Sequence, residues 1–111
     1  MTRPDAFLPP VDIVVTPEEY IIVIDIPGIK KEDIVLKRRN VVTLVKGVRR
    51  KSKISQHFDP KSYDKAERKF GEFNLNFKIP EEFERKWYFF EVKNGTMCIK
   101  YKRDMDGENS E

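Results

Sequence analysis

Histidine and cysteine, the side chains most often used as general base and nucleophile, each occur once in this chain and stand far apart in the sequence. The only histidine is His57 and the only cysteine is Cys98. His57 lies in a polar segment with no Cys or Ser partner beside it, and Cys98 lies on an expected strand with no basic residue spaced to activate its thiol. We therefore expect structural or surface roles for both residues.

Acidic residues suggest two further kinds of site, and neither pattern is complete. Glu81, Glu82 and Glu84 are close enough for a paired-carboxylate site, but a solvated turn after Pro80 explains them more simply. Asp104 begins an Asp-Met-Asp-Gly run that lacks the later ligands of a calcium loop. No phosphate-cradling glycines and no metal-ligand spacing are present. The sequence therefore predicts no enzyme, no cofactor and no metal.

Basic residues exceed acidic ones only slightly. The net charge is +3 and the pI is near 9.0. The basic residues gather at 37–39 and 49–53, and blocks this short are typical of solvated turns and loops. A basic nucleic-acid-binding module that uses these blocks beside Phe58 or Tyr63 is one alternative function, and its mark would be steep loss of binding with added salt.

Length and composition predict one all-β domain. A chain of 111 residues can bury one core but has no room for a second domain. In residues 70–80, Phe73, Leu75, Phe77 and Ile79 alternate with polar residues, which predicts a half-buried strand that ends near Ile79, before a proline. Further strands are expected at 11–16, 20–26, 33–37, 41–46, 87–92 and 96–101, with a short helical turn at 29–34. About eight such strands favour an antiparallel immunoglobulin-like β-sandwich.

The expected organisation has three parts. Residues 1–10 form a short arm that is extended and poorly ordered up to the first strand. Residues 11–103 form the sandwich, interrupted after Gly47 by a long charged loop at 48–69 that lacks apolar periodicity. Residues 104–111 form an acidic tail. A loop of this length usually has a function.

The number of cysteines and the hydropathy of the sequence indicate the cellular compartment. One cysteine excludes an intramolecular disulfide, and no apolar run approaches the length of a membrane span or a signal-peptide core. The sequence therefore predicts an intracellular, cytoplasmic protein with no membrane partner.

Three segments together resemble the α-crystallin domain of the small heat shock proteins. They are Asp25-Ile-Pro-Gly-Ile-Lys-Lys-Glu-Asp-Ile34, then Glu67-Arg-Lys-Phe-Gly-Glu-Phe73 running on to Ile79-Pro80, and Lys93-Asn-Gly95 before a last strand. Each is moderately specific alone, and their order and spacing are strongly so. The resemblance covers nearly the whole chain, residues 10–102.

The resemblance implies that loop 48–69 carries a strand exchanged with a partner subunit, as in bacterial and plant members of the family. Such a segment has few apolar neighbours, and adding it to a partner's sheet edge satisfies its backbone groups. The expected dimer-interface residues are Ser62, Tyr63, Asp64, Lys65, Ala66, Glu67 and Arg68. We therefore expect a homodimer, and the alternative is a charged loop on a monomer.

The resemblance also implies a groove into which family members dock a tail bearing two aliphatic residues one apart. Its expected walls, which are also the client-binding candidates, are Ile34, Leu36, Arg38, Trp87 and Phe89. Arg38 and Phe89 stand where other residue types are usual, so the groove is either closed by them or open with the arginine swung aside. The tail after Arg103 lacks the aliphatic pair, and the arm is short, so large oligomers are not expected.

The function implied by the resemblance is that of an ATP-independent holdase chaperone. Such a protein binds partly unfolded clients through exposed apolar or edge-strand surface and suppresses their aggregation, without a cofactor. The main alternative is a co-chaperone-type sandwich that docks on a large ATP-driven chaperone. The long loop and the pattern of residues 71–80 argue against that alternative.

Overall fold

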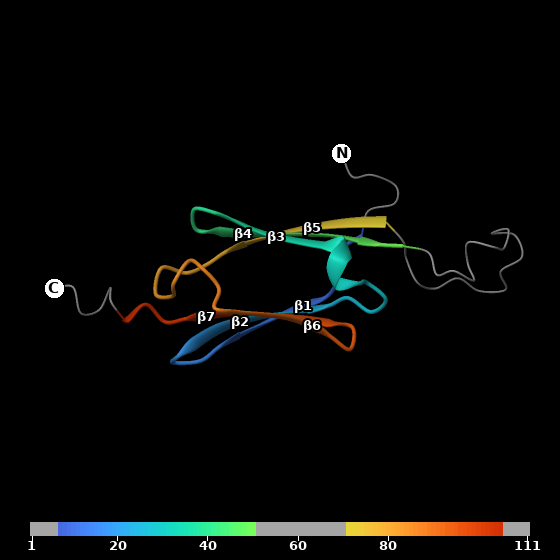
Figure 1. Cartoon of the computed structure of the whole chain (residues 1–111). Helices are drawn as coiled ribbons and strands as arrows, with labels where there is room; N and C mark the ends of the chain where they lie inside the picture. The colour runs from blue at the N-terminus through green and yellow to red at the C-terminus, as the bar shows by residue number, and fades with distance from the viewer. Residues whose placement is uncertain (1–6, 51–70, 106–111) are drawn as a thin grey trace, which may run out of the picture.

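The molecule consists of two antiparallel sheets packed face to face, seen edge-on in Figure 1. The computed structural model describes residues 7–50 and 71–105. The strands in these ranges are β1 (Val11–Val15), β2 (Glu19–Asp25), β3 (Ile34–Arg39), β4 (Val42–Arg49), β5 (Gly71–Lys78), β6 (Phe89–Lys93) and β7 (Thr96–Lys102), with a 3-10 turn η1 (Lys31–Asp33). One sheet has the order β1-β2-β7-β6 and the other β3-β4-β5. The predicted all-β sandwich is confirmed, and the strand expected at 62–68 lies outside the described residues.

Turn chemistry sets the positions of two hairpins. The β3–β4 turn contains Asn40 with a φ of 54°, and the β6–β7 turn contains Asn94 and Gly95 with φ values of 53° and 76°. Asparagine and glycine adopt this left-handed conformation at the least cost. The strands that flank both turns were expected from the sequence and are confirmed. In the ranges that the structure describes, no helix is long and apolar enough to cross a membrane.

The core lies between the sheets and is built from alternate residues of the central strands. The buried apolar side chains of β2 and β7 are Tyr20, Ile22, Ile24, Met97, Ile99 and Tyr101. A hydrogen-bonded polar pair is buried with them. The hydroxyls of Thr43 in β4 and Tyr101 in β7 lie 2.7 Å apart. This hydrogen bond joins one sheet to the other through the middle of the sandwich.

Gly47 lies inside β4 and does not end it, which corrects the expected strand boundary. A Cβ at this position would overlap the ring of Phe73, which is paired opposite it in β5. Strand β4 continues past Gly47 to Arg49. The guanidinium carbon of Arg49 stands 4.7 Å from the ring centroid of Phe7. Arg49 is only 9% exposed, so the prediction of a solvated basic block at 49–53 is wrong for this residue.

Residues 7–10 bridge the two sheets ahead of β1, and the prediction that they are poorly ordered is wrong. The backbone N–H of Phe7 donates to the carbonyl of Glu72 in β5 at 3.0 Å. The carbonyl of Pro10 accepts from the N–H of Asp25 in β2, also at 3.0 Å. The Phe7 ring packs against the core. Burial of this aromatic side chain favours the ordered arrangement.

Candidate interaction surfaces at the sheet edges

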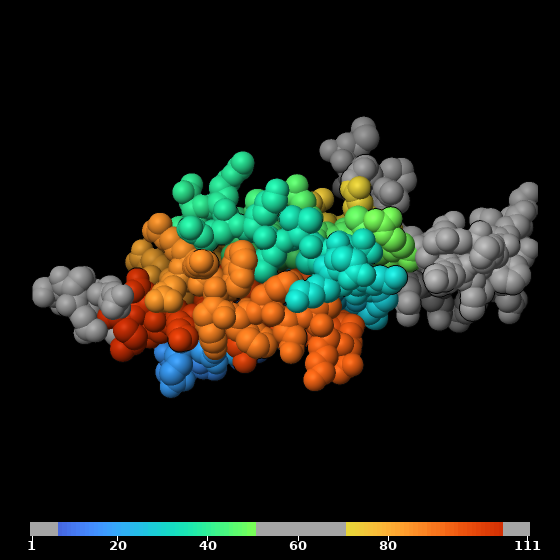
Figure 2. All heavy atoms as spheres, viewed as in Figure 1, coloured from blue at the N-terminus to red at the C-terminus, as the bar shows by residue number. Residues whose placement is uncertain are grey.

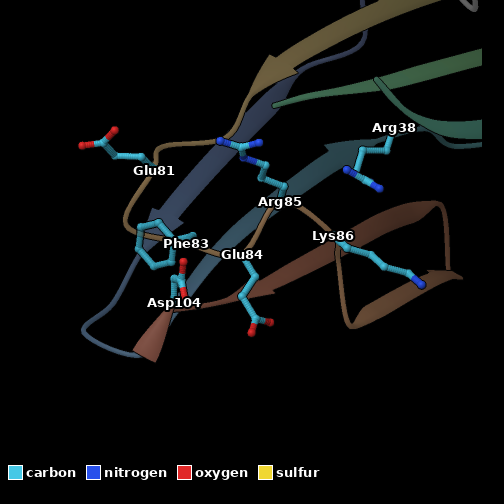
Figure 3. A pocket seen from close by; sticks show the side chains of 7 residues that line it. All are labelled: Arg38, Glu81, Phe83, Glu84, Arg85, Lys86 and Asp104. Carbon is cyan, nitrogen blue, oxygen red and sulfur yellow. The ribbon is translucent and has the colours of Figure 1, made fainter. Parts of the chain in front are cut away.

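The side chains that could act in catalysis or bind a metal ion lie apart from one another. Cys98 is half-buried on β7, and burial raises the pKa of its thiol, which disfavours a reactive thiolate. Glu81 and Glu84 point away from each other in Figure 3, and His57 lies outside the described residues. Within the ranges that the structure describes, no three His, Cys, Asp or Glu side chains gather to hold a metal ion. These residues therefore form no nucleophile–base pair or paired-carboxylate site there.

The hollow drawn in Figure 3 lies where the turn after β5 meets the end of β7. Its volume is about 430 Å³, and its lining consists of Arg38, Glu81, Phe83, Glu84, Arg85, Lys86 and Asp104. Phe83 is 3% exposed and packs on Tyr20, with ring centroids 5.4 Å apart, so the turn expected to be polar carries a core residue. The acidic and basic side chains of the lining balance each other. The hollow thus has no net charge to select a small ionic ligand.

A seam runs where the edge strand β3 of one sheet meets the edge strand β6 of the other. Figure 2 shows the teal atoms of β3 lying against the orange atoms of β6 and of the segment before it. Ile34, Leu36 and Trp87 are half-buried and pack against the core. Arg38, on β3 with Ile34 and Leu36, is exposed and lines the hollow of Figure 3. Three of the expected groove residues are therefore packed on the core beside the seam, and Arg38 stands at one end.

The aromatic residue of β6 that faces the core is Phe90, and Phe89 faces the other way. Phe90 is paired opposite the buried Ile99 and packs against the core, with the Lys31 ammonium 5.8 Å from its ring centroid. Phe89 is paired opposite Lys100, whose ammonium lies 4.9 Å from the Phe89 ring. Neighbouring residues of a strand point to opposite faces. Phe90 therefore takes the core-facing position of β6, one residue after Phe89, which was expected to form a groove wall.

Strand β1 is an apolar edge of the four-stranded sheet. Ile13, Val14 and Val15 are 46%, 46% and 59% exposed. Among the described strands, only β2 pairs with β1. The outward backbone groups of an unpaired edge are a template for another strand. The residues expected to form an exchanged strand, 62–68, lie outside the described residues.

The fold is thus a two-sheet β-sandwich with two apolar surfaces, the β1 edge and the β3–β6 seam. The chain belongs to the Hsp20/alpha crystallin family, whose family model matches residues 12–111. This is a family of small heat shock proteins.

The relatives agree with this assignment. A 22.7 kDa class IV heat shock protein from Pisum sativum is 33% identical over an alignment of 87 residues that covers 76% of this chain and 42% of the relative. A 17.4 kDa class III heat shock protein from Arabidopsis thaliana is 31% identical over an alignment of 99 residues that covers 85% of this chain and 63% of the relative. The chain thus spans about half the length of such relatives.

Solved structures show the same fold. A small heat-shock protein from Xylella fastidiosa superposes with a TM-score of 0.76 at 24% identity, covering 87% of this chain and 86% of that one. Heat shock protein 16.0 from Schizosaccharomyces pombe gives a TM-score of 0.76 at 18% identity, covering 87% of each chain. At these identities the likeness concerns the fold alone.

Proposed function

We propose that this chain is an ATP-independent holding chaperone that binds partly unfolded polypeptides and slows their aggregation. The observation that carries the proposal is the β3–β6 seam, where Ile34, Leu36 and Trp87 stay half-exposed beside the core. Exposed apolar surface captures the apolar segments of an unfolded chain without a covalent step or a cofactor. Preference for unfolded chains then suffices, because sequestration follows by mass action.

The lone tryptophan offers a direct test. Trp87 is the only tryptophan in the chain, and it lies half-buried in the seam. A tryptophan-free client is heated with the protein, with and without ATP, while light scattering and tryptophan emission are recorded together. We expect ATP-independent loss of scattering and a shift of emission to shorter wavelength as the client covers Trp87. Aggregation at the rate of the client alone would refute holding activity, and suppression with unchanged emission would move the client site away from the seam.

Two neighbouring aromatic residues give a matched pair of variants. Trp87→Ala removes a seam side chain, and we expect it to weaken suppression of aggregation. Tyr88→Ala is the control, because Tyr88 is 44% exposed and its ring lies 5.0 Å from the Lys102 ammonium. Circular dichroism of both variants checks that the sandwich is retained. Equal loss of activity in the two variants would indicate nonspecific adhesion to any exposed aromatic side chain.

We also propose that two copies form a homodimer by exchanging residues 62–68, each adding to the β1 edge of the partner subunit. The support is the exposed aliphatic edge of β1, because an added strand would cover it and satisfy its backbone. Light scattering coupled to size exclusion tests this on the wild type, on a Gly/Ser replacement of 62–68 and on Val15→Lys. Val35→Lys, at a residue 45% exposed on β3, is the control. We expect dimers for the wild type and the control and monomers for the other two, and a monomeric wild type would overturn the proposal.

We infer, finally, that the protein is not an enzyme and that it acts in the cytoplasm. A single cysteine supports a reducing compartment, where disulfides are not used for stability. Fractionation of the source cells with an antibody against the chain tests the location. Recovery in the secreted or the membrane fraction would contradict it.

A further inference from the structure

The outer surface of the three-stranded sheet carries a group of basic side chains that the sequence distributes over three strands. The strand registers bring together Lys37 and Arg39 of β3, Lys46 of β4 and Lys78 of β5. All four are exposed. In Figure 2 the side chains of the β3–β4 hairpin project from the upper surface of the molecule. We call this surface the basic face.

Carboxylates are absent from the three cross-strand rows that hold these cations in the described sheet. Polar residues in the same rows are Asn74 and Asn76, which carry no charge. The nearest acidic residues beyond the rows are Asp33 and Glu72, which line a hollow together with Lys46 at the end of the sheet away from the β3–β4 hairpin. Asp33 is bound there to Arg50 at 3.2 Å. Within the described sheet, the end of the basic face nearest the β3–β4 hairpin, with Lys37, Arg39 and Lys78, therefore keeps a net positive charge.

The outer surface of the other sheet differs in its charge pattern. There Lys100 stands in one row with Val14, Ile21 and Phe89, and the next row holds Asp12 and Glu91 at its two ends. Charges of both signs thus alternate with apolar residues on that side. The segregation of positive charge is a property of the three-stranded sheet alone.

The side chains that lie among the cations indicate which kind of partner the basic face can bind. Half-buried Val42 and Leu44 lie in the middle strand, and no aromatic side chain belongs to the three rows. Single-stranded nucleic acid binds best where bases can stack on aromatic rings, so the face lacks that platform. Lys37 and Arg39 are two residues apart on one strand, a spacing of roughly 6.6 Å. An extended polypeptide with acidic residues at alternate positions repeats the same spacing.

We propose that the basic face binds acidic segments of unfolded polypeptides, so that the chaperone favours acidic clients. This inference rests on the proposed holding function and assigns it a second contact surface, separate from the β3–β6 seam. Lysine and arginine pair with client carboxylates while Val42 and Leu44 contact the client's aliphatic groups. Because these pairs are exposed, each contributes little, and the three cations nearest the hairpin act together.

The test uses two fluorescent peptides of equal length, one with Glu alternating with Thr and the other with Gln in place of Glu. Fluorescence anisotropy gives their dissociation constants for the wild type and for two triple variants. One variant is Lys37→Gln, Arg39→Gln and Lys78→Gln. The control carries the same charge change elsewhere, as Lys30→Gln, Lys93→Gln and Lys102→Gln. We expect the wild type and the control to bind the Glu peptide about tenfold more tightly than the first variant does.

The outcomes separate this inference from the proposed function. The preference for the Glu peptide should disappear at high salt, because exposed charge pairs are screened. Equal affinity of the two triple variants for the Glu peptide would overturn the inference. If both variants still suppress the aggregation of a charge-balanced client, the holding function stands by itself. A short oligonucleotide that binds the wild type tightly, loses affinity in the first variant and outcompetes the Glu peptide would instead make the basic face a nucleic-acid site.

Discussion

The buried hydrogen bond between Thr43 and Tyr101 permits a quantitative stability prediction. The two hydroxyl oxygens lie 2.7 Å apart, and both residues are 0% exposed. Tyr101→Phe keeps the ring and its packing but removes the partner of the Thr43 hydroxyl. A buried polar group left unsatisfied costs about 1–3 kcal/mol. We therefore expect the free energy of unfolding to fall by about 2 kcal/mol near neutral pH.

The size of this effect depends on pH. Burial raises the pKa of Tyr101 to about 12, and the hydrogen bond to Thr43 offsets only part of that rise. The pKa in the unfolded chain is about 10. Between these two values the folded state keeps a proton that the unfolded state has lost, so stability present below the unfolded pKa is lost as the pH rises. At about pH 11 the wild type has lost about 1.4 kcal/mol through this residue, and Tyr101→Phe has lost none of it.

Urea unfolding followed by the fluorescence of Trp87 measures both numbers. We expect the difference between the wild type and Tyr101→Phe to shrink from about 2 kcal/mol near pH 8 to about 0.6 kcal/mol near pH 11. Tyr88→Phe is the matched control, because Tyr88 is 44% exposed, and it should alter neither value. A difference that stays constant with pH would refute the reasoning, since Tyr101 would then ionise as in the unfolded chain.

Three further predictions follow from packing and burial. Gly47→Ala should lower the free energy of unfolding by about 1–3 kcal/mol, because the added methyl group meets the ring of Phe73; urea denaturation measures it, and the neighbouring exposed Lys46→Ala should stay near the wild type. Phe7→Ala should cost about 1–2 kcal/mol by the same assay, and an unchanged midpoint would mean that residues 7–10 do not hold the sheets together. Alkylation of Cys98 at mildly alkaline pH should be slower in the folded than in the urea-unfolded chain, because burial raises the thiol pKa; equal rates would contradict this.

Alternation is enough to predict a strand where one of its faces is polar. In β5, Phe73 is buried and Leu75 is half-buried, while Asn74 and Asn76 are exposed, as the sequence predicts. The N–H of Ile79 donates to the carbonyl of Val41, the turn residue just before β4, at 2.9 Å. The paired strand itself ends at Lys78, one residue short of the expected end at Ile79.

Contacts that depend on distant residues could not be predicted in this way. Residues 87–90 are four aromatic residues in a row, so their phase follows from the pairing of Phe90 with Ile99 in β7. The polar neighbours of Val92 carry the local signal that would have set the phase correctly. The stacking of Arg49 on Phe7 joins segments far apart in the chain, and no local pattern announces it. The proposed client and dimer contacts depend on other molecules as well, so local patterns in one sequence predict them least.

The pairing of β2 with β7 has a consequence for the synthesis of this protein. It joins residue 19 to residue 102 and sets Ile22 opposite Ile99 in the core. Pairings between such distant residues make folding slow, because a long loop must close before the contacts can form. A ribosome completes the β1–β2 hairpin long before β7 emerges, and the apolar faces of that hairpin have no strand to cover them in the interval. Each nascent copy is thus itself an aggregation-prone chain until its last strand appears.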